Sequence, residues 1–278
     1  MSRAKDALKL VVGRVADLAL PELGREIDDS RNTSRLPTLK RAILYARLRR
    51  AQSRGDAAAI EHALAAFWIG DSGDRFHDHY AEERFNLFSE HHAVVVDALA
   101  GVLGASGARF SRLVEIGCGD GKVLAYCAGR LPSISEAIGL DINAAVIARI
   151  SAEQPAGGAL SFARAEARDW LTANPRPGTV VLSNGGVLEY FSQDNLDKLL
   201  QALARSAPAA VALVEPVAPD HDLQSQAGSF AFGHENSFSH NHAHRLSQAG
   251  FDVVFAQEVQ TSQARWMLMI GVLNGSAP

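Results

Sequence analysis

Apolar side chains recur at helical spacing through the first 110 residues. The pattern predicts three helices, over residues 38–52, 57–69 and 91–103, with apolar residues on one side and polar residues on the other. A glycine follows each of the last two helices, as is typical of helix ends. The polar stretch at residues 71–74 predicts a loop.

The pattern changes at Phe110, where short apolar runs begin to alternate with helical segments. The runs predict strands over residues 112–116, 137–141, 159–164, 179–183 and 209–215. Helices are predicted between and after them, over residues 122–130, 144–153, 167–173, 193–205 and 242–249. Two adjacent strands, 252–259 and 264–273, close the chain. We therefore expect an α/β fold: a seven-stranded sheet with helices on both faces, an antiparallel last strand and a helical N-terminal extension.

Composition narrows the class of protein. Hydrophobic residues make up 47% of the 278 residues, which is enough for a sizeable core and excludes wholesale disorder. No apolar run is long enough to span a membrane, and charged residues interrupt the first 20 positions, which argues against a secretory signal. Two cysteines cannot form a disulfide scaffold or a four-thiolate zinc site. The expected location is the cytoplasm.

The net charge of −4 hides an asymmetry. Residues 1–57 hold 13 basic and 7 acidic residues, whereas the remainder holds 14 basic and 24 acidic residues. The basic run over 31–54 suits either a solvated helix face or a docking surface for an acidic carrier. No nucleic-acid motif accompanies it, and neither a nucleic-acid nor a membrane partner is expected. Residues 1–75 are predicted to form a helical extension that covers the functional site or makes a homodimer contact.

The strongest chemical signal is a glycine-rich turn at residues 117–121, between a buried strand and a helix. Glycines permit a tight turn and close approach of a ligand to the backbone. Dinucleotide-binding enzymes use such turns too, but here Lys122 stands where their last glycine falls, and Glu115 would repel a pyrophosphate. A carboxylate at Glu115 favours a cationic ligand such as S-adenosylmethionine. Asp141 ends the next strand, 20 residues after Gly121, where an acid can accept both ribose hydroxyls.

Taken together in order and spacing, four segments resemble the class I S-adenosylmethionine-dependent methyltransferases, which are Rossmann-like. These are VEIGCGDG, GLDIN, ARAEA and SNGGVLEYF, and the closing SHNHAHRLSQAGFDVV resembles the last helix and sixth strand of the family. The resemblance covers residues 76–278, which we take as the cofactor-binding domain. It implies a methyltransferase whose cofactor is S-adenosyl-L-methionine.

The resemblance also implies which residues meet the cofactor. Around the methionine part it places Glu115, Gly117, Cys118, Gly119, Tyr80 and Arg84. Around ribose and adenine it places Asp141, Ile142, Glu166 and Ala167. Asn184 and Gly185 would lie beside the sulfonium. The chain departs from the family at Glu166, where aspartate is commoner, and the Cys118 thiol is interpreted as a small group in a turn, since nothing basic adjoins it.

The long segment at residues 216–239 predicts a lid, and it is rich in phenylalanine and histidine. These side chains suit a small acceptor with a ring or an acyl chain. A histidine here is a candidate general base, with His240 ahead of His234 and His242, although His240 could equally satisfy a backbone group. No metal is expected, because no recognised ligand spacing is present.

The sequence thus predicts methyl transfer to a nitrogen or oxygen nucleophile of a small-molecule metabolite in a biosynthetic setting. Two alternatives stay open. One is a methyltransferase acting on a protein or a carrier-bound substrate docked by the basic N-terminal segment. The other is a non-catalytic cofactor-binding subunit, in which the lid fills the acceptor pocket.

Overall fold

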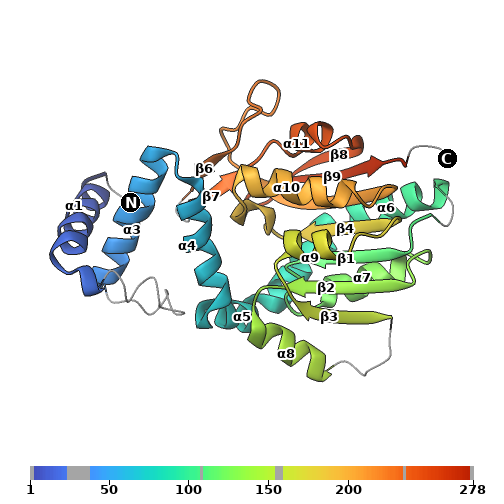
Figure 1. Ribbon diagram of the computed structural model, residues 1–278, viewed down its shortest axis with the longest axis horizontal. Helices are drawn as coiled ribbons and strands as arrows, with labels where there is room; N and C mark the ends of the chain where they lie inside the picture. The colour runs from blue at the N-terminus through green and yellow to red at the C-terminus, as the bar shows by residue number, and fades with distance from the viewer. Residues whose placement is uncertain (1–2, 24–37, 107–108, 154–158, 234–235, 276–278) are drawn as a thin grey trace. The chain divides into compact units, whose positions relative to one another are not determined.

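The computed structural model describes residues 3–23, 38–106, 109–153, 159–233 and 236–275 (Figure 1). The chain forms two compact units. One comprises residues 1–76 and 231–237, and the other comprises residues 77–230 and 238–278. No helix in the described part of the chain is both long and apolar enough to cross a membrane.

The smaller unit is built from helices α1 (Arg3–Ala19), α3 (Thr38–Arg54) and α4 (Ala57–Ile69). Helices α1 and α3 pack closely because Gly13 has no side chain: a Cβ there would lie 2.0 Å from the carbonyl oxygen of Ala42. Ala16 and Ile43 form the buried contact between the two helices. The spacing of α1 and α3 therefore depends on a glycine at position 13.

The prediction of a loop at residues 71–74 is wrong. Helix α5 (Asp71–Leu87) begins there, one residue after α4 ends. Gly70 is extended, with φ −96° and ψ −179°, so a single residue separates the two helices. Aspartate and serine are common both in loops and at helix starts, which is why their presence misled the prediction. The helix predicted from residue 91 is preceded by a π-helical turn at Phe88–His92 and runs as α6 (Val94–Ala105).

The larger unit contains a seven-stranded sheet in the order β3-β2-β1-β4-β5-β9-β8, which confirms the predicted fold class (Figure 1). Its strands are β1 (Arg112–Ile116), β2 (Glu136–Asp141), β3 (Leu160–Arg164), β4 (Thr179–Asn184), β5 (Ala209–Val217), β8 (Asp252–Gln260) and β9 (Arg265–Leu273). The first five are parallel, and β9 runs antiparallel to both β5 and β8. The described helices and turns that accompany them are α6, α7 (Lys122–Arg130), α8 (Ala144–Glu153), α9 (Ala167–Ala173), η3 (Leu188–Tyr190), α10 (Gln193–Ala204) and α11 (His242–Gln248).

Two apolar layers cover the sheet, one on each face. Leu113 belongs to the layer that includes residues of α6 and α7, whereas its neighbour Val114 belongs to the layer that includes α9 and α10. Successive side chains of a strand point to opposite faces, so a strand covered on both sides must be apolar throughout. This requirement explains why β1, β4 and β5 are mainly apolar in the sequence.

The order of the strands places the carboxyl ends of β1 and β4 side by side. The chain leaves β1 toward β2 on one side of the sheet and returns to β4 on the other, so this is the point where the strand order reverses. Open α/β sheets bind their ligands in the crevice that forms there. The predicted lid contains two short strands, β6 (Phe230–Phe232) and β7 (Ser237–Ser239), which pair with each other.

A pair of matched substitutions tests this burial pattern. Val211 on β5 is fully buried, whereas Val254 on β8 is 52% exposed. We expect Val211→Ala to lower the free energy of unfolding by about 1–3 kcal/mol, because it removes two buried methyl groups and leaves a cavity. Val254→Ala should change it by less than about 0.5 kcal/mol. Urea denaturation of both variants measures the difference, and equal losses would contradict the placement of β5 at the centre of the sheet.

Candidate functional site

The glycine-rich turn after β1 adjoins the loop after β4. Gly117 has a positive φ of 66°, and a Cβ there would lie 2.7 Å from Cγ2 of Val187. Any larger residue would be strained by the backbone angle and would also clash with Val187. The glycine therefore allows the two loops at the switch point to meet.

Asp141, at the end of β2, holds the backbone of this turn. Its Oδ2 accepts a hydrogen bond from Gly119 N at 3.2 Å, and its Oδ1 accepts one from Asn143 N at 2.9 Å. The side chain is buried, with 7% of its surface exposed. Each carboxylate oxygen can accept more than one hydrogen bond, so the same group retains capacity for ligand hydroxyls.

Two buried acceptors at the ends of β1 and β4 lack partners. Glu115 Oε2 and Asn184 Oδ1 make no hydrogen bond within the described part of the chain. Burial, reinforced by the nearby Asp120, raises the pKa of Glu115 well above its usual value. Buried polar atoms are normally paired, because an unpaired one costs free energy. Acceptors in this position fit a ligand that carries positive charge and N–H donors.

Helix α5 contributes two side chains near the same turns. Arg84 donates from Nη2 to the carbonyl oxygen of Gly185 at 2.7 Å. The His77 ring lies over Gly119, since a Cβ on that glycine would be 3.2 Å from its Cε1 and Nδ1. Burial lowers the pKa of His77, while Asp141 opposes that shift. His77 was not among the predicted site residues, although its spacing of seven residues from Arg84 puts both side chains on one face of the helix.

The remaining residues expected at the cofactor have varied surroundings. Tyr80 is 39% exposed and its ring contacts that of His79. The Cys118 thiol is buried near Gly139, and burial raises its pKa well above the usual value. Glu166 caps helix α9 by accepting from Asp169 N at 3.1 Å, and Ala167 is buried behind it. Ile142 is half-buried beside Asp141.

Glu215, at the end of β5, is a further buried carboxyl group. It accepts hydrogen bonds from Ser183 Oγ at 2.6 Å, Leu188 N at 3.0 Å and Val187 N at 3.4 Å. These contacts fix the loop after β4. Burial raises the pKa of Glu215 to about 8. From the sequence, Glu215 was predicted only as the last residue of a strand, with no role in the site.

Two of the candidate histidines, His240 and His242, lie within the described residues, and both are buried. In His240, Nδ1 lies 2.7 Å from Ser229 Oγ and Nε2 lies 3.1 Å from the carbonyl oxygen of Leu188. Burial lowers the pKa of His240 to about 4, so the ring is neutral at pH 7. His242 lies beside it, with 5.5 Å between ring centroids, and its pKa is also lowered by burial. His234 lies outside the described residues.

Within the described part of the chain, no group of three or more His, Cys, Asp or Glu residues could hold a metal ion. The donors and acceptors at the strand ends instead suit an organic ligand: Glu115, Asp141 and Asn184 supply acceptors, and Arg84 supplies donors. This set fits an amino acid joined to a ribose, because it offers groups for an ammonium, a carboxylate and two hydroxyls.

Comparison with known proteins agrees with this geometry. Residues 113–208 match the family model described as a methyltransferase domain. Two structures of magnesium protoporphyrin IX methyltransferase (ChlM) from Synechocystis PCC 6803 are similar in fold. The one with bound SAM has 15% identity and a TM-score of 0.54, and the match covers 77% of this chain and 96% of that chain. The one with bound SAH has 14% identity and a TM-score of 0.55, covering 77% and 99%.

A third structure, a 1,6-didemethyltoxoflavin-N1-methyltransferase from Burkholderia thailandensis, has 14% identity and a TM-score of 0.49, covering 74% of this chain and 90% of that chain. No curated protein matches the chain. The fold is Rossmann-like, and the groups at the strand ends fit a nucleoside-bearing ligand. The fold is shared with methyltransferases solved with bound SAM and SAH, and over residues 113–208 the chain also matches a methyltransferase domain.

The raised pKa of Glu215 predicts a pH dependence of stability. Because the pKa rises from 4.5 to about 8 on folding, the carboxyl's contribution is fully present below pH 4.5 and is lost as pH rises toward 8. Relative to Glu215→Gln, the wild-type free energy of unfolding should therefore fall over this range, by at most about 1.4 kcal/mol per pH unit. Glutamine is a suitable reference because it does not titrate and can still accept from Leu188 N.

Urea denaturation at pH 5, 6.5 and 8 measures this dependence. Glu153→Gln, at an exposed position on α8, serves as the control and should follow the wild type at every pH. If Glu215→Gln also follows the wild type at every pH, Glu215 is ionised in the folded protein and the interpretation is wrong.

Proposed function

We propose that this chain transfers the methyl group of S-adenosylmethionine to a nitrogen or oxygen nucleophile of a small-molecule metabolite. The observation that carries the proposal is the set of buried acceptors at the carboxyl ends of β1, β2 and β4: Glu115, Asp141 and Asn184. A dinucleotide would bring a negatively charged pyrophosphate to these groups, whereas S-adenosylmethionine brings an ammonium and a sulfonium.

In this proposal, residues at different strand ends contact different parts of the cofactor. Glu115 accepts from the ammonium, and Arg84, with Tyr80, meets the carboxylate. The backbone of Gly117, Cys118 and Gly119 surrounds the methionine part. Asp141 and Ile142 hold ribose and adenine, while Glu166 and Ala167 flank the adenine. Asn184 and Gly185 lie beside the sulfonium, where the buried amide oxygen of Asn184 favours positive charge.

When bound, the cofactor supplies a methyl group on a positively charged sulfur, so the acceptor's lone pair forms the new bond as the carbon–sulfur bond breaks and a neutral thioether leaves. The chain has to align the acceptor with that methyl group and exclude water. An amine acceptor must only be unprotonated, whereas a hydroxyl acceptor benefits from a general base.

The aromatic rings of the segment after β5 support a small acceptor. The rings of Phe230 and His221 lie 4.8 Å apart, and those of Phe238 and His240 lie 6.1 Å apart. Flat apolar groups of this kind suit an acceptor with a ring or an acyl chain. The carrier partner and the homodimer stay predictions, as does the cover role of residues 1–75.

The cofactor assignment predicts the effect of Asp141→Asn. The change replaces one acceptor oxygen by an amide that donates, so we expect binding of S-adenosylhomocysteine to weaken by about 1–3 kcal/mol. Asp194→Asn, an exposed change in the first turn of α10, should leave the affinity unchanged. Titration calorimetry measures both, and tight binding of NAD without binding of S-adenosylhomocysteine would overturn the proposed function.

The surroundings of His240 favour positioning over proton transfer, because both ring nitrogens have partners in the protein. His240→Ala should lower turnover by about tenfold without moving the pH–rate profile, and His240→Asn should restore part of the loss. His244 is half-buried on helix α11, shortly after His240, so His244→Ala is the matched control and should have little effect. A loss of 10²–10⁴-fold in both His240 variants, with one limb of the pH profile removed, would instead identify His240 as a general base.

A further inference from the structure

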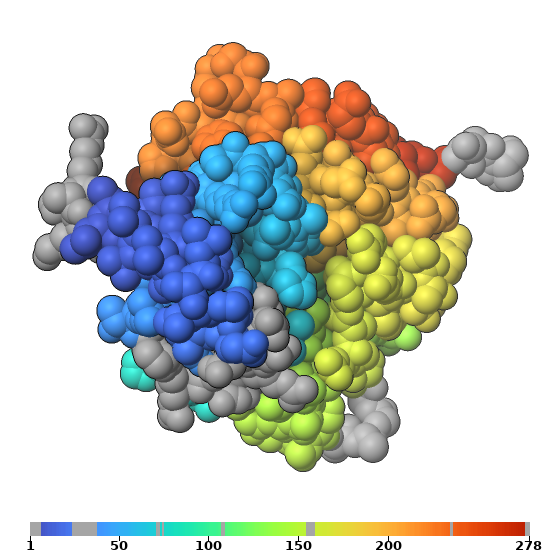
Figure 2. All heavy atoms as spheres, turned by 60° about the vertical axis from the view of Figure 1, so that its left-hand side comes forward, coloured from blue at the N-terminus to red at the C-terminus, as the bar shows by residue number. Residues whose placement is uncertain are grey.

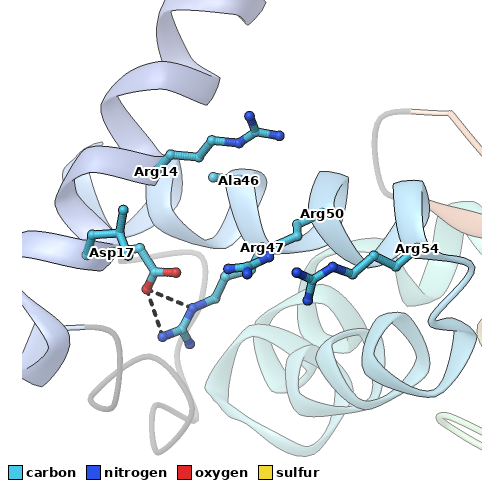
Figure 3. Close-up of a pocket in the computed structure, with 7 residues that line it drawn as sticks. Arg14, Asp17, Ala46, Arg47, Arg50 and Arg54 are labelled. Carbon is cyan, nitrogen blue, oxygen red and sulfur yellow. Dashed lines mark hydrogen bonds and ion pairs between the residues drawn. The ribbon is translucent and has the colours of Figure 1, made fainter.

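The smaller unit contains a pocket of about 430 Å³ between helices α1 and α3. Four arginines line it: Arg14 on α1, and Arg47, Arg50 and Arg54 on α3. In Figure 3 the side chains of Arg14 and Arg54 extend from opposite sides of the view. The close packing of the two helices at Gly13 fixes the distance between the elements that form its walls.

One of these arginines is neutralised within the unit. Arg47 donates from Nε to Asp17 Oδ1 at 3.0 Å, and its Nη2 lies 2.9 Å from the same oxygen (Figure 3). Arg14, Arg50 and Arg54 form no ion pair in the described part of the chain. The pocket therefore has four guanidinium groups and a single carboxylate in its lining, and its net charge is positive.

The pocket also has an apolar side. Leu18 and Ala46 belong to its lining, and Leu18 is 81% exposed. Leu18 continues a stripe of exposed apolar residues along α1 that includes Leu8, Val11 and Val15. Helix α1 is the dark blue segment at the surface in Figure 2. Exposed leucine beside unpaired arginines indicates a ligand with both a charged and an apolar part.

We propose that this pocket binds a phosphate ester that carries an apolar chain. Guanidinium groups bind phosphate through paired, charge-assisted hydrogen bonds, and three of them converge here from two helices. The apolar chain lies along Leu18 and the hydrocarbon parts of the arginines. The pocket is formed by residues of the smaller unit, whereas the strand ends proposed to hold the cofactor belong to the larger unit, so the proposal stands or falls independently of the proposed function.

Titration of the full-length protein with hexyl phosphate at low ionic strength tests the proposal, with inorganic phosphate and hexanol as separate probes. Hexyl phosphate should bind more tightly than either probe alone. Arg50→Gln and Arg54→Gln should each weaken its binding by about tenfold, since each removes charge-assisted hydrogen bonds. Leu18→Ala should weaken binding of hexyl phosphate and leave that of inorganic phosphate unchanged.

Arg41→Gln is the matched control, because Arg41 is exposed on the same helix and does not line the pocket. It should change the affinity by less than twofold. An equal loss in Arg41→Gln and Arg50→Gln would show a diffuse positive field and overturn the proposal, as would the absence of hexyl phosphate binding. Thermal unfolding of each variant verifies that the helices remain folded.

Vesicles containing phosphatidic acid distinguish the two sources of such a ligand. If the protein binds hexyl phosphate and also binds these vesicles in an Arg50-dependent manner, the pocket takes a lipid headgroup. If it binds hexyl phosphate alone, the ligand is a soluble ester. Binding to vesicles without any binding of hexyl phosphate would assign the interaction to the apolar stripe of α1 and would overturn the proposal that the pocket is the binding site.

Discussion

The pairing of buried carboxyl groups with backbone amides at the ends of parallel strands is the constraint on which the rest of this site depends. Asp141 ends β2 and holds Gly119 and Asn143, while Glu215 ends β5 and holds the loop that follows β4. Loops at this edge have no ladder of their own to satisfy their N–H groups. Without these carboxyl groups, the glycine turn and the loop after β4 would lack a defined separation.

Glu215 and Asp141 both accept hydrogen bonds from loop N–H groups, but their surroundings differ. Glu215 is fully enclosed by protein, and burial favours its neutral form, so it acts through hydrogen bonds alone. Asp141 retains some exposure and spare acceptor capacity. A ligand hydroxyl that bonds to Asp141 would therefore act on a group that already fixes the turn. In the proposed function, this one side chain would couple cofactor binding to order in the glycine turn.

The sequence was sufficient to predict the sheet to within two residues at each strand end, because strands buried on both faces are mainly apolar. It failed at α5, where Asp71 and the residues after it favour a loop and a helix start alike. The roles of His77 and Glu215 could not be predicted because both depend on contacts with residues that are distant in sequence, Gly119 and Ser183 respectively. The roles of the predicted cofactor and catalytic residues stay predictions, since hydrogen bonds within the chain do not identify what a ligand contacts.

The N-terminal arginines are a second case in which contacts between distant residues decide the role of a side chain. A count of charges distinguishes a basic segment from an acidic one, but it does not tell which charges are neutralised. Asp17 pairs with Arg47, which is 30 residues away, and only the packing of α1 on α3 brings them together. The same packing leaves Arg14, Arg50 and Arg54 around a concave space with Leu18 at its edge. The basic segment thereby forms a pocket with a defined shape, in which the charge of the arginines and the apolar surface of Leu18 would both contribute to binding of the proposed phosphate ester.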